Sequence, residues 1–250
     1  MILDNSPARS AELMAGGRVD AALVPVFAYQ SIAGLRLVPD VCVGARERVR
    51  SVCVVTKGDD LKDVHSVSLD ISSRTSVALT KIIFREFLGF EPEWRDAEPN
   101  LDAMLAQSDA ALLIGDPALS IAERGVRCTE PAFPNSALPV PRSAFRKFDL
   151  AQLWKSFTGL GFIFAMWMTR DETSPINFAH ARDEGLDHIE EIVSNYESEI
   201  PLARDEMRCY LSENISYRID DSMQAGLELY YRLAEKHGLI ERNKPLRYTI

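Results

Sequence analysis

Four hydroxyl side chains and one guanidinium are crowded into the segment 70–76, Asp-Ile-Ser-Ser-Arg-Thr-Ser. A short apolar run precedes this segment and a helical pattern follows it, so Ser72, Arg74, Thr75 and Ser76 are predicted to lie at the start of a helix. Free backbone N–H groups and the positive end of the helix dipole make such a turn suitable for a carboxylate or a phosphate. A heavily capped helix without a ligand is the alternative, because Ser and Thr are also capping residues.

A second polar turn follows the apolar run from Ala110 to Ile114 and reads Gly115-Asp116-Pro117. A glycine at the end of a buried strand lets a ligand approach the backbone. Asp116 is therefore a candidate for orienting a hydroxyl or for acting as a base. Equally, Asp116 could cap a helix that starts at Pro117, since a capping residue followed by proline is a common helix start.

Ser51 lies in another apolar strand pattern, 49–56, and is a third candidate to face a ligand. The sequence contains no G-x-S-x-G, G-x-x-x-x-G-K-[ST], G-x-G-x-x-G or H-E-x-x-H motif, so serine hydrolase, nucleotide and zinc-protease chemistry lack their usual signals. We expect no metal site, because the cysteines are widely spaced and have no histidine at ligand spacing. We expect these thiols to be reduced and buried: Cys42, Cys53, Cys128 and Cys209.

The composition of the 250-residue chain is that of a globular protein, with 46% hydrophobic residues and a formal net charge of -9. This charge opposes general attraction to nucleic acid or to anionic lipid. The longest uncharged stretches, 21–35 and 156–169, are shorter than the roughly 18 residues that span a bilayer. Reduced cysteines and an N-terminus without a secretory pattern predict a cytoplasmic protein whose partner is a small molecule. The acidic run 171–213 is predicted to be a solvated helix face, with an acidic docking surface as the alternative.

Apolar runs separated by helical patterns predict an α/β fold with two lobes joined by two crossovers. We expect the first lobe to comprise residues 1–57 and 142–250 and the second to comprise 58–141, with a proline-rich connection near 126–148. Phe162–Thr169 belongs to the most hydrophobic strand and is expected to be central. Such a fold binds its ligand between the lobes. The other strands are predicted near 19–24, 35–43, 49–56, 67–69, 92–95 and 110–114, and the main helices near 8–15, 75–88, 101–107, 153–157, 178–200 and 223–234.

The chain resembles the chorismate dehydratases of the futalosine route to menaquinone. The resemblance is carried by Val67-Ser-Leu-Asp-Ile-Ser-Ser-Arg-Thr-Ser-Val-Ala-Leu-Thr80 and by Asp109-Ala-Ala-Leu-Leu-Ile-Gly-Asp-Pro-Ala-Leu119, and it extends through 17–25, 50–52 and 157–167. It implies a type II periplasmic-binding-protein fold and dehydration of chorismate to 3-[(1-carboxyvinyl)oxy]benzoate without a cofactor. The substrate's own side-chain carboxylate has been suggested as the base in this family.

Carried over by position, the resemblance implies that Thr75 and Ser76 hold a substrate carboxylate and that Ser51 donates to a substrate oxygen. It also implies that the turn 114–116 forms the facing wall. Many relatives have a small residue at the position of Arg74, which predicts that this side chain points to solvent.

The chain differs from the family at its N-terminus, and two alternative functions remain open. Relatives begin with a further strand and a Tyr-Leu-Asn-like loop that has no counterpart before Met1, so we expect unpaired backbone beside 19–24 and faster hydrogen exchange in 19–54 than in 67–114. The chief alternative function is a non-catalytic binding protein for small anions with the same fold. The other is an enzyme of the same pathway acting on a dehypoxanthine futalosine, for which a histidine in the cleft would be expected.

Overall fold

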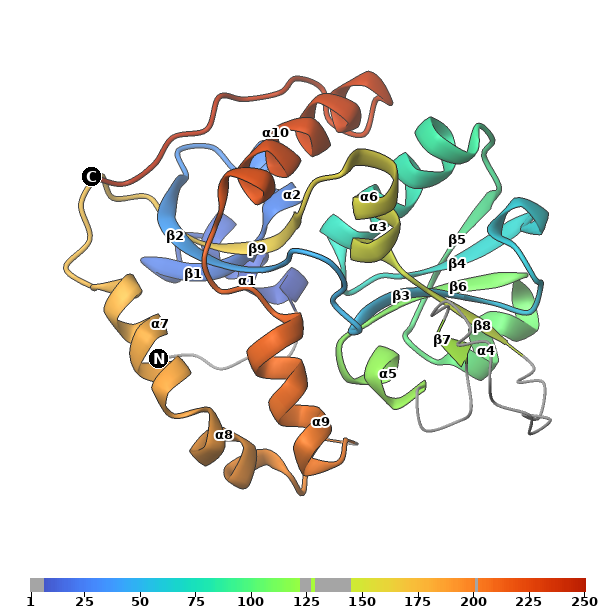
Figure 1. Ribbon diagram of the computed structural model, residues 1–250. Coiled ribbons are helices and arrows are strands. Elements are labelled where there is room, and N and C mark those ends of the chain that lie inside the picture. Colours follow the sequence, from blue (N-terminus) through green and yellow to red (C-terminus); the bar gives the residue numbers. More distant parts are fainter. Residues whose placement is uncertain (1–6, 122–126, 129–144, 201) are drawn as a thin grey trace.

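Two α/β lobes lie side by side in the computed structural model, which describes residues 7–121, 127–128, 145–200 and 202–250 (Figure 1). The first lobe contains a three-stranded sheet with the order β1-β9-β2, formed by β1 (Ala21–Pro25), β9 (Phe162–Thr169) and β2 (Arg36–Ala45). The predicted central position of β9 is confirmed. Its two partners are both antiparallel to it.

The second lobe contains a six-stranded sheet with the order β5-β4-β6-β3-β8-β7. Both β5 (Glu93–Ala97) and β6 (Ala110–Ile114) pair in parallel with β4 (Ser66–Asp70). On its other side, β6 pairs with β3 (Val52–Thr56) in the antiparallel sense. The carboxyl ends of β4 and β6 therefore lie at the same edge of the sheet as the start of β3.

The strand β3 belongs to the second sheet, although the predicted division placed residues 1–57 in the first lobe. The same holds for β8 (Arg146–Asp149), which pairs with β3 and, in parallel, with β7 (Arg127–Cys128). By sheet membership, the chain crosses between lobes before β3 and after β8. The sequence of an apolar strand does not indicate which sheet it joins, because any such strand can form the backbone hydrogen bonds of either sheet. Most of the predicted proline-rich connection lies outside the described residues.

Helices cover both sheets. Those that the sequence predicted begin and end within a few residues of the expected positions, whereas the helix Val26–Ser31 was not predicted. Asn100 caps α4 by accepting from the Ala103 N–H. Gly89 adopts the left-handed conformation, with a φ of 80°, and ends the helical segment that begins with α3. The predicted helix over 75–88 is α-helical only to Ile82 and continues as the π-helical turn η2. The helices are α1 (Pro7–Ala15), α2 (Val26–Ser31), α3 (Arg74–Ile82), η2 (Ile83–Leu88), α4 (Leu101–Gln107), α5 (Gly115–Ser120), α6 (Leu150–Thr158), α7 (Phe178–Asp187), α8 (Ile189–Tyr196), α9 (Arg204–Cys209), the π-helical η4 (Tyr210–Asn214) and α10 (Asp221–Lys236), with the short 3-10 turn η1 (Leu61–Asp63) before β4.

One buried cluster joins the two lobes where α3 packs against α10. Leu79 and Ile82 of α3 and Leu227 and Tyr230 of α10 belong to this cluster, and all four are at most 1% exposed. The lobes therefore share a hydrophobic core along one side. The predicted site must lie at the rim of this core, where the strands of the second sheet end.

A polar contact between the lobes borders this core, and it predicts a pH dependence. Glu86 of η2 lies 2.7 Å from Lys236 Nζ and 2.8 Å from His237 Nε2. The hydrogen bond from Lys236, followed by that from His237, holds the pKa of Glu86 below its ordinary value. We expect Glu86→Gln to lower the free energy of unfolding by about 0.5–1 kcal/mol at neutral pH. This difference should begin to shrink as the pH falls through about 4.5, the ordinary pKa of a glutamate, and it should be lost as the pH falls through the lower pKa of Glu86 in the folded protein.

Urea denaturation of both proteins across this pH range measures the effect. Combining Glu86→Gln with Lys236→Gln should add less than the two single changes together, since they remove the same contact. A wild-type advantage that persists unchanged at pH 3 would contradict the assignment.

The edge position of β1 leads to a second expected result. Among the described residues, β1 pairs with β9 alone, whereas β4 has a strand on each side. An edge strand leaves a row of amides outside the ladder. We expect hydrogen exchange to be faster in β1 than in β4 and β6, as measured by mass spectrometry of peptic fragments under native conditions. Equal protection would show that another segment covers this edge.

The part of the chain that the structure describes has no helix that is both long and apolar enough to cross a bilayer.

The acidic run forms α7, α8 and α9, where Arg204 contacts Glu190 and Glu197 on an exposed surface. This arrangement matches the predicted solvated helix face.

Candidate functional site

Three chain segments meet at the shared edge of β4, β6 and β3. The Gly115 N–H donates to the Ser51 carbonyl at 2.7 Å, which ties the β6–α5 turn to the residue before β3. The Ile114 N–H donates to Asp70 Oδ2 at 3.3 Å, which ties the same turn to the end of β4. The structure therefore brings together three of the candidate residues, Ser51, Ile114 and Gly115.

Asp70 is the centre of this arrangement, and the sequence analysis assigned it no role. Its carboxylate is fully buried and accepts the Ser72 N–H at 2.9 Å and the Ser72 hydroxyl at 2.5 Å, besides the Ile114 N–H. Because both oxygens are engaged, Asp70 fixes the two loops relative to each other. Its place as the last residue of a buried strand was a signal for such a role.

Ser73 caps α3 by accepting the Ser76 N–H at 3.3 Å. The capped-helix interpretation therefore accounts for Ser73 and, through Asp70, for Ser72. It does not account for the Ser76 hydroxyl, for which the structure records no hydrogen bond among the described residues.

Thr75 connects the helix start to the first lobe. Its hydroxyl accepts the Phe27 N–H at 3.2 Å, and its carbonyl accepts from the Tyr230 hydroxyl at 3.1 Å. Thr75 and Ser76 are both only 2% exposed. The two side chains that were predicted to hold an anion thus lie beneath α2 and α10 in this conformation.

Arg74 and Asp116 are both exposed, and they stand apart from the buried hydroxyls. The exposure of Arg74 agrees with the expectation that it points to solvent. Asp116 lies in the first turn of α5, whose N-cap is Ile114 without a side-chain bond, so the predicted cap is wrong. The helix begins two residues earlier than the position of Pro117 suggested, because Gly115 adopts a φ of 63° and starts the turn itself.

Open space lies beside Gly115, since a Cβ built there would meet no atom within 4 Å. The glycine is required by its positive φ rather than by crowding. This leaves the backbone of the turn accessible, as we expected for a residue that a ligand approaches.

Tyr210 contacts a candidate site residue, although the sequence pattern did not single it out. Its hydroxyl donates to Ser51 Oγ at 2.9 Å across a separation of 159 residues. Burial raises the pKa of Tyr210. The hydrogen bond to Ser51 lowers this pKa and the charge of Asp116 raises it, and the net effect is an increase. Tyr210 therefore stays protonated and remains a donor at neutral pH. No local pattern distinguishes it from a core tyrosine, although π-helical turns such as η4 are frequent at functional sites.

The histidines lie elsewhere. His237 contacts Glu86, and His188 Nδ1 lies 2.7 Å from the Glu184 carbonyl. None of the described hydrogen bonds joins a histidine to Ser51, Asp70 or Ser76. The expectation of a cleft histidine is therefore not met by the described contacts. Of the cysteines, Cys42 and Cys53 are buried as predicted, whereas Cys209 is half-buried.

Comparison with known proteins gives relatives over most of the chain. The sequence model of a family described as menaquinone biosynthesis matches residues 1–236. A chorismate dehydratase from Thermus thermophilus is 32% identical over 244 residues, which cover 95% of this chain and 87% of the relative. This confirms the resemblance inferred from the sequence.

Solved structures that are similar to this chain share its fold at low sequence identity. A protein from Archaeoglobus fulgidus has a TM-score of 0.61 at 15% identity and covers 96% of this chain and 86% of its own. A Candida albicans gene product with the generic periplasmic binding protein fold has a TM-score of 0.60 at 12% identity, over 97% of this chain and 80% of its own. The periplasmic aliphatic sulphonate binding protein of Escherichia coli has a TM-score of 0.57 at 13% identity, over 98% and 84%.

The predicted two-lobed, periplasmic-binding-protein-like fold is thereby confirmed. With a family model that matches most of its length and a relative above 30% identity, this chain belongs to the menaquinone-biosynthesis family.

Proposed function

We propose that this protein dehydrates chorismate to 3-[(1-carboxyvinyl)oxy]benzoate and water, as a hydro-lyase that needs no cofactor. The observation that carries the proposal is the 32% identity to a chorismate dehydratase over 95% of the chain. The convergence of Ser51, the β6–α5 turn and the start of α3 at one sheet edge supports it, because these are the segments on which the resemblance rests.

Recruitment of the substrate relies on local donors, since a chain with a net charge of -9 repels a dianion at long range. The Phe27 N–H and the Thr75 hydroxyl meet at the start of α3, and together with the Ser76 hydroxyl of the same turn they can bind one carboxylate. Both hydroxyls are buried, so the substrate reaches them when α2 moves away from α3. The carboxylate then takes the place of the Phe27–Thr75 hydrogen bond.

The chemistry requires one proton to leave the ring and one hydroxyl to leave the neighbouring carbon. As the ring hydrogen beside the enolpyruvyl ether is removed, the C–O bond to the hydroxyl breaks and the ring becomes aromatic. The substrate's side-chain carboxylate serves as the base, as the resemblance implies. Asp70 is unsuited to this task because three donors already occupy its carboxylate. Asp116 is exposed near Tyr210 and is the alternative base.

Ser51 assists the departure of the hydroxyl. Tyr210 donates into the Ser51 oxygen, which leaves the Ser51 proton free to point at a substrate oxygen. A donor aimed at developing negative charge lowers the barrier more than it strengthens ground-state binding. Tyr210 acts through Ser51 and is a positioning residue in this scheme.

An absorbance assay for the aromatic product, run with chorismate in the presence of EDTA, tests the proposal. We expect turnover by the wild type, a loss of about 100-fold in kcat for Ser51→Ala, and a smaller loss for Tyr210→Phe. The exposed Ser156→Ala on α6 is the matched control and should retain full activity. Binding of chorismate without product would favour the non-catalytic anion-binding alternative and would defeat the enzymatic proposal.

A further inference from the structure

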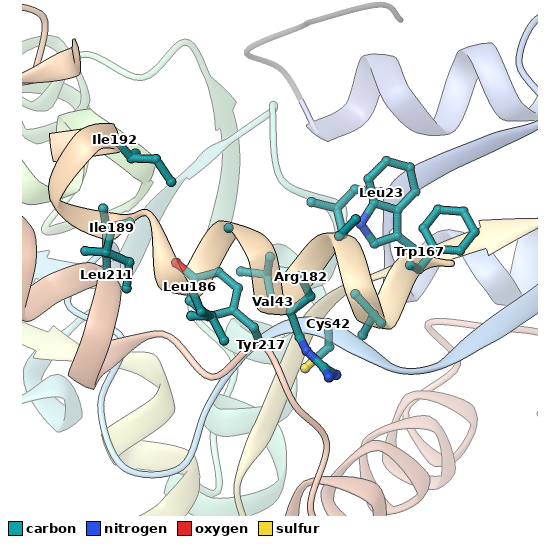
Figure 2. Close-up of a pocket in the computed structure, with 14 residues that line it drawn as sticks. Leu23, Cys42, Val43, Trp167, Arg182, Leu186, Ile189, Ile192, Leu211 and Tyr217 are labelled. Atoms are coloured by element: carbon teal, nitrogen blue, oxygen red, sulfur yellow. The ribbon is translucent and has the colours of Figure 1, made fainter. Parts of the chain in front are cut away.

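A cavity of about 330 Å³ lies in the first lobe, between one face of the three-stranded sheet and the helices α7 and α8 (Figure 2). Leu23, Val43 and Trp167 line it from the sheet, and Leu186, Ile189 and Ile192 line it from the helices. None of the residues of the candidate functional site lines this cavity. Because helices already cover the sheet here, the space suits a small molecule rather than a protein segment.

Among the described residues, no unpaired charge lines this cavity. The cationic side chain in this part of the lining, Arg182, is held by Asp40 at 2.9 Å and by Asp183 at 2.8 Å, and Asp183 also contacts Arg218. Burial raises the pKa of the Cys42 thiol to about 12, so this side chain stays neutral. A dianion such as chorismate would lose its hydration here without gaining a free cation, which makes the cavity unsuitable for the proposed substrate.

The wall of the cavity contains one tyrosine, Tyr217. Within the part of the chain that the structure describes, no hydrogen bond is recorded for its hydroxyl. Figure 2 shows this hydroxyl beside the helix that carries Leu186. A tyrosine hydroxyl in an apolar wall is stabilised by a ligand that supplies one oxygen as its hydrogen-bond partner.

The helix α7 preserves the space. Gly185 lies in its interior and lines the cavity, and a Cβ built there would meet no atom within 4 Å. Glycine is a poor helix former, so a larger residue would fill the cavity and favour the helix at once. Its presence keeps open a volume that lies within the range of small-molecule sites, roughly 300–1,000 Å³.

We propose that this cavity binds a small uncharged molecule, mainly hydrocarbon, with one oxygen that pairs with Tyr217. This site is separate from the one proposed for chorismate. The cavity borders the proposed chorismate site through Leu211, a residue of the cavity wall that directly follows Tyr210 in η4.

Calorimetric titration with three probes of one shape tests the proposal: 2-naphthol, naphthalene and naphthalene-2-sulfonate. We expect 2-naphthol to bind at least about 10-fold more tightly than the charged sulfonate, and saturating chorismate to leave its affinity unchanged. Tyr217→Phe should weaken 2-naphthol by about 2- to 10-fold and leave naphthalene unaffected, because only one hydrogen bond is removed.

Two cavity-filling variants, Gly185→Leu and Ala181→Leu, should each reduce 2-naphthol affinity by at least about 10-fold. Glu184→Leu is the matched control, because Glu184 is an exposed α7 residue outside the cavity wall, and it should have no effect. Thermal melts establish that each variant is folded. Equal binding of the sulfonate, competition by chorismate, or equal effects of Gly185→Leu and Glu184→Leu would each overturn the proposal.

Discussion

Replacing Asp70 by alanine is expected to lower the free energy of unfolding by about 3–5 kcal/mol and to remove most turnover. The fully buried carboxylate accepts the Ile114 N–H, the Ser72 N–H and the Ser72 hydroxyl. Alanine leaves two backbone donors without a partner in a buried site, at about 1–3 kcal/mol each, and it also removes a charge-assisted hydrogen bond. Turnover falls because the β4–α3 and β6–α5 loops lose the group that sets their relative position.

Chemical denaturation and the chorismate assay measure the two effects. Asp70→Asn keeps one acceptor oxygen and the same shape, so its loss of stability should be intermediate. Asp63→Ala serves as the control, because Asp63 is exposed in the same lobe and no side-chain hydrogen bond is recorded for it. If Asp70→Ala were as stable as Asp63→Ala, Asp70 would not be the group that joins the two loops.

Gly226→Ala is expected to destabilise the protein by about 2 kcal/mol, although alanine is the better helix former. Gly226 lies in α10 where this helix meets the start of β9, and a Cβ there would collide with the Gly161 carbonyl. Overpacking against backbone typically costs about 1–3 kcal/mol and exceeds the gain in helix propensity. The Trp154 indole N–H donates to this same carbonyl at 3.2 Å, so a shift of Gly161 would also disturb a buried hydrogen bond.

The same substitution at Gly185 gives the matched comparison. Gly185 is also helical, but its Cβ position is open. Gly185→Ala should therefore raise the free energy of unfolding by up to about 1 kcal/mol. Thermal and urea unfolding of both variants should show changes of opposite sign. A stabilised Gly226→Ala would show that α10 can move away from β9 without loss.

Local chemistry in the sequence determined where most elements begin and end. Ser73 and Asn100 cap helices because short polar side chains satisfy the first free N–H groups, and Gly89 ends a helix because it tolerates a positive φ. The apolar run of β9 indicated a central strand, since a strand that is apolar at successive positions has both of its faces covered. Polar turns after β4 and β6 located one side of the candidate site.

Tertiary structure alone decided which strands share a sheet and which distant groups meet. The ladder of β3 is formed by generic backbone bonds, so its apolar side chains did not reveal that it belongs to the second sheet. The bond from Tyr210 to Ser51 and the contact of Phe27 with Thr75 depend on how whole helices pack, and no local pattern encodes them. The cavity beside Gly185 is likewise a property of the space between α7 and the sheet, which exists only once both are in place.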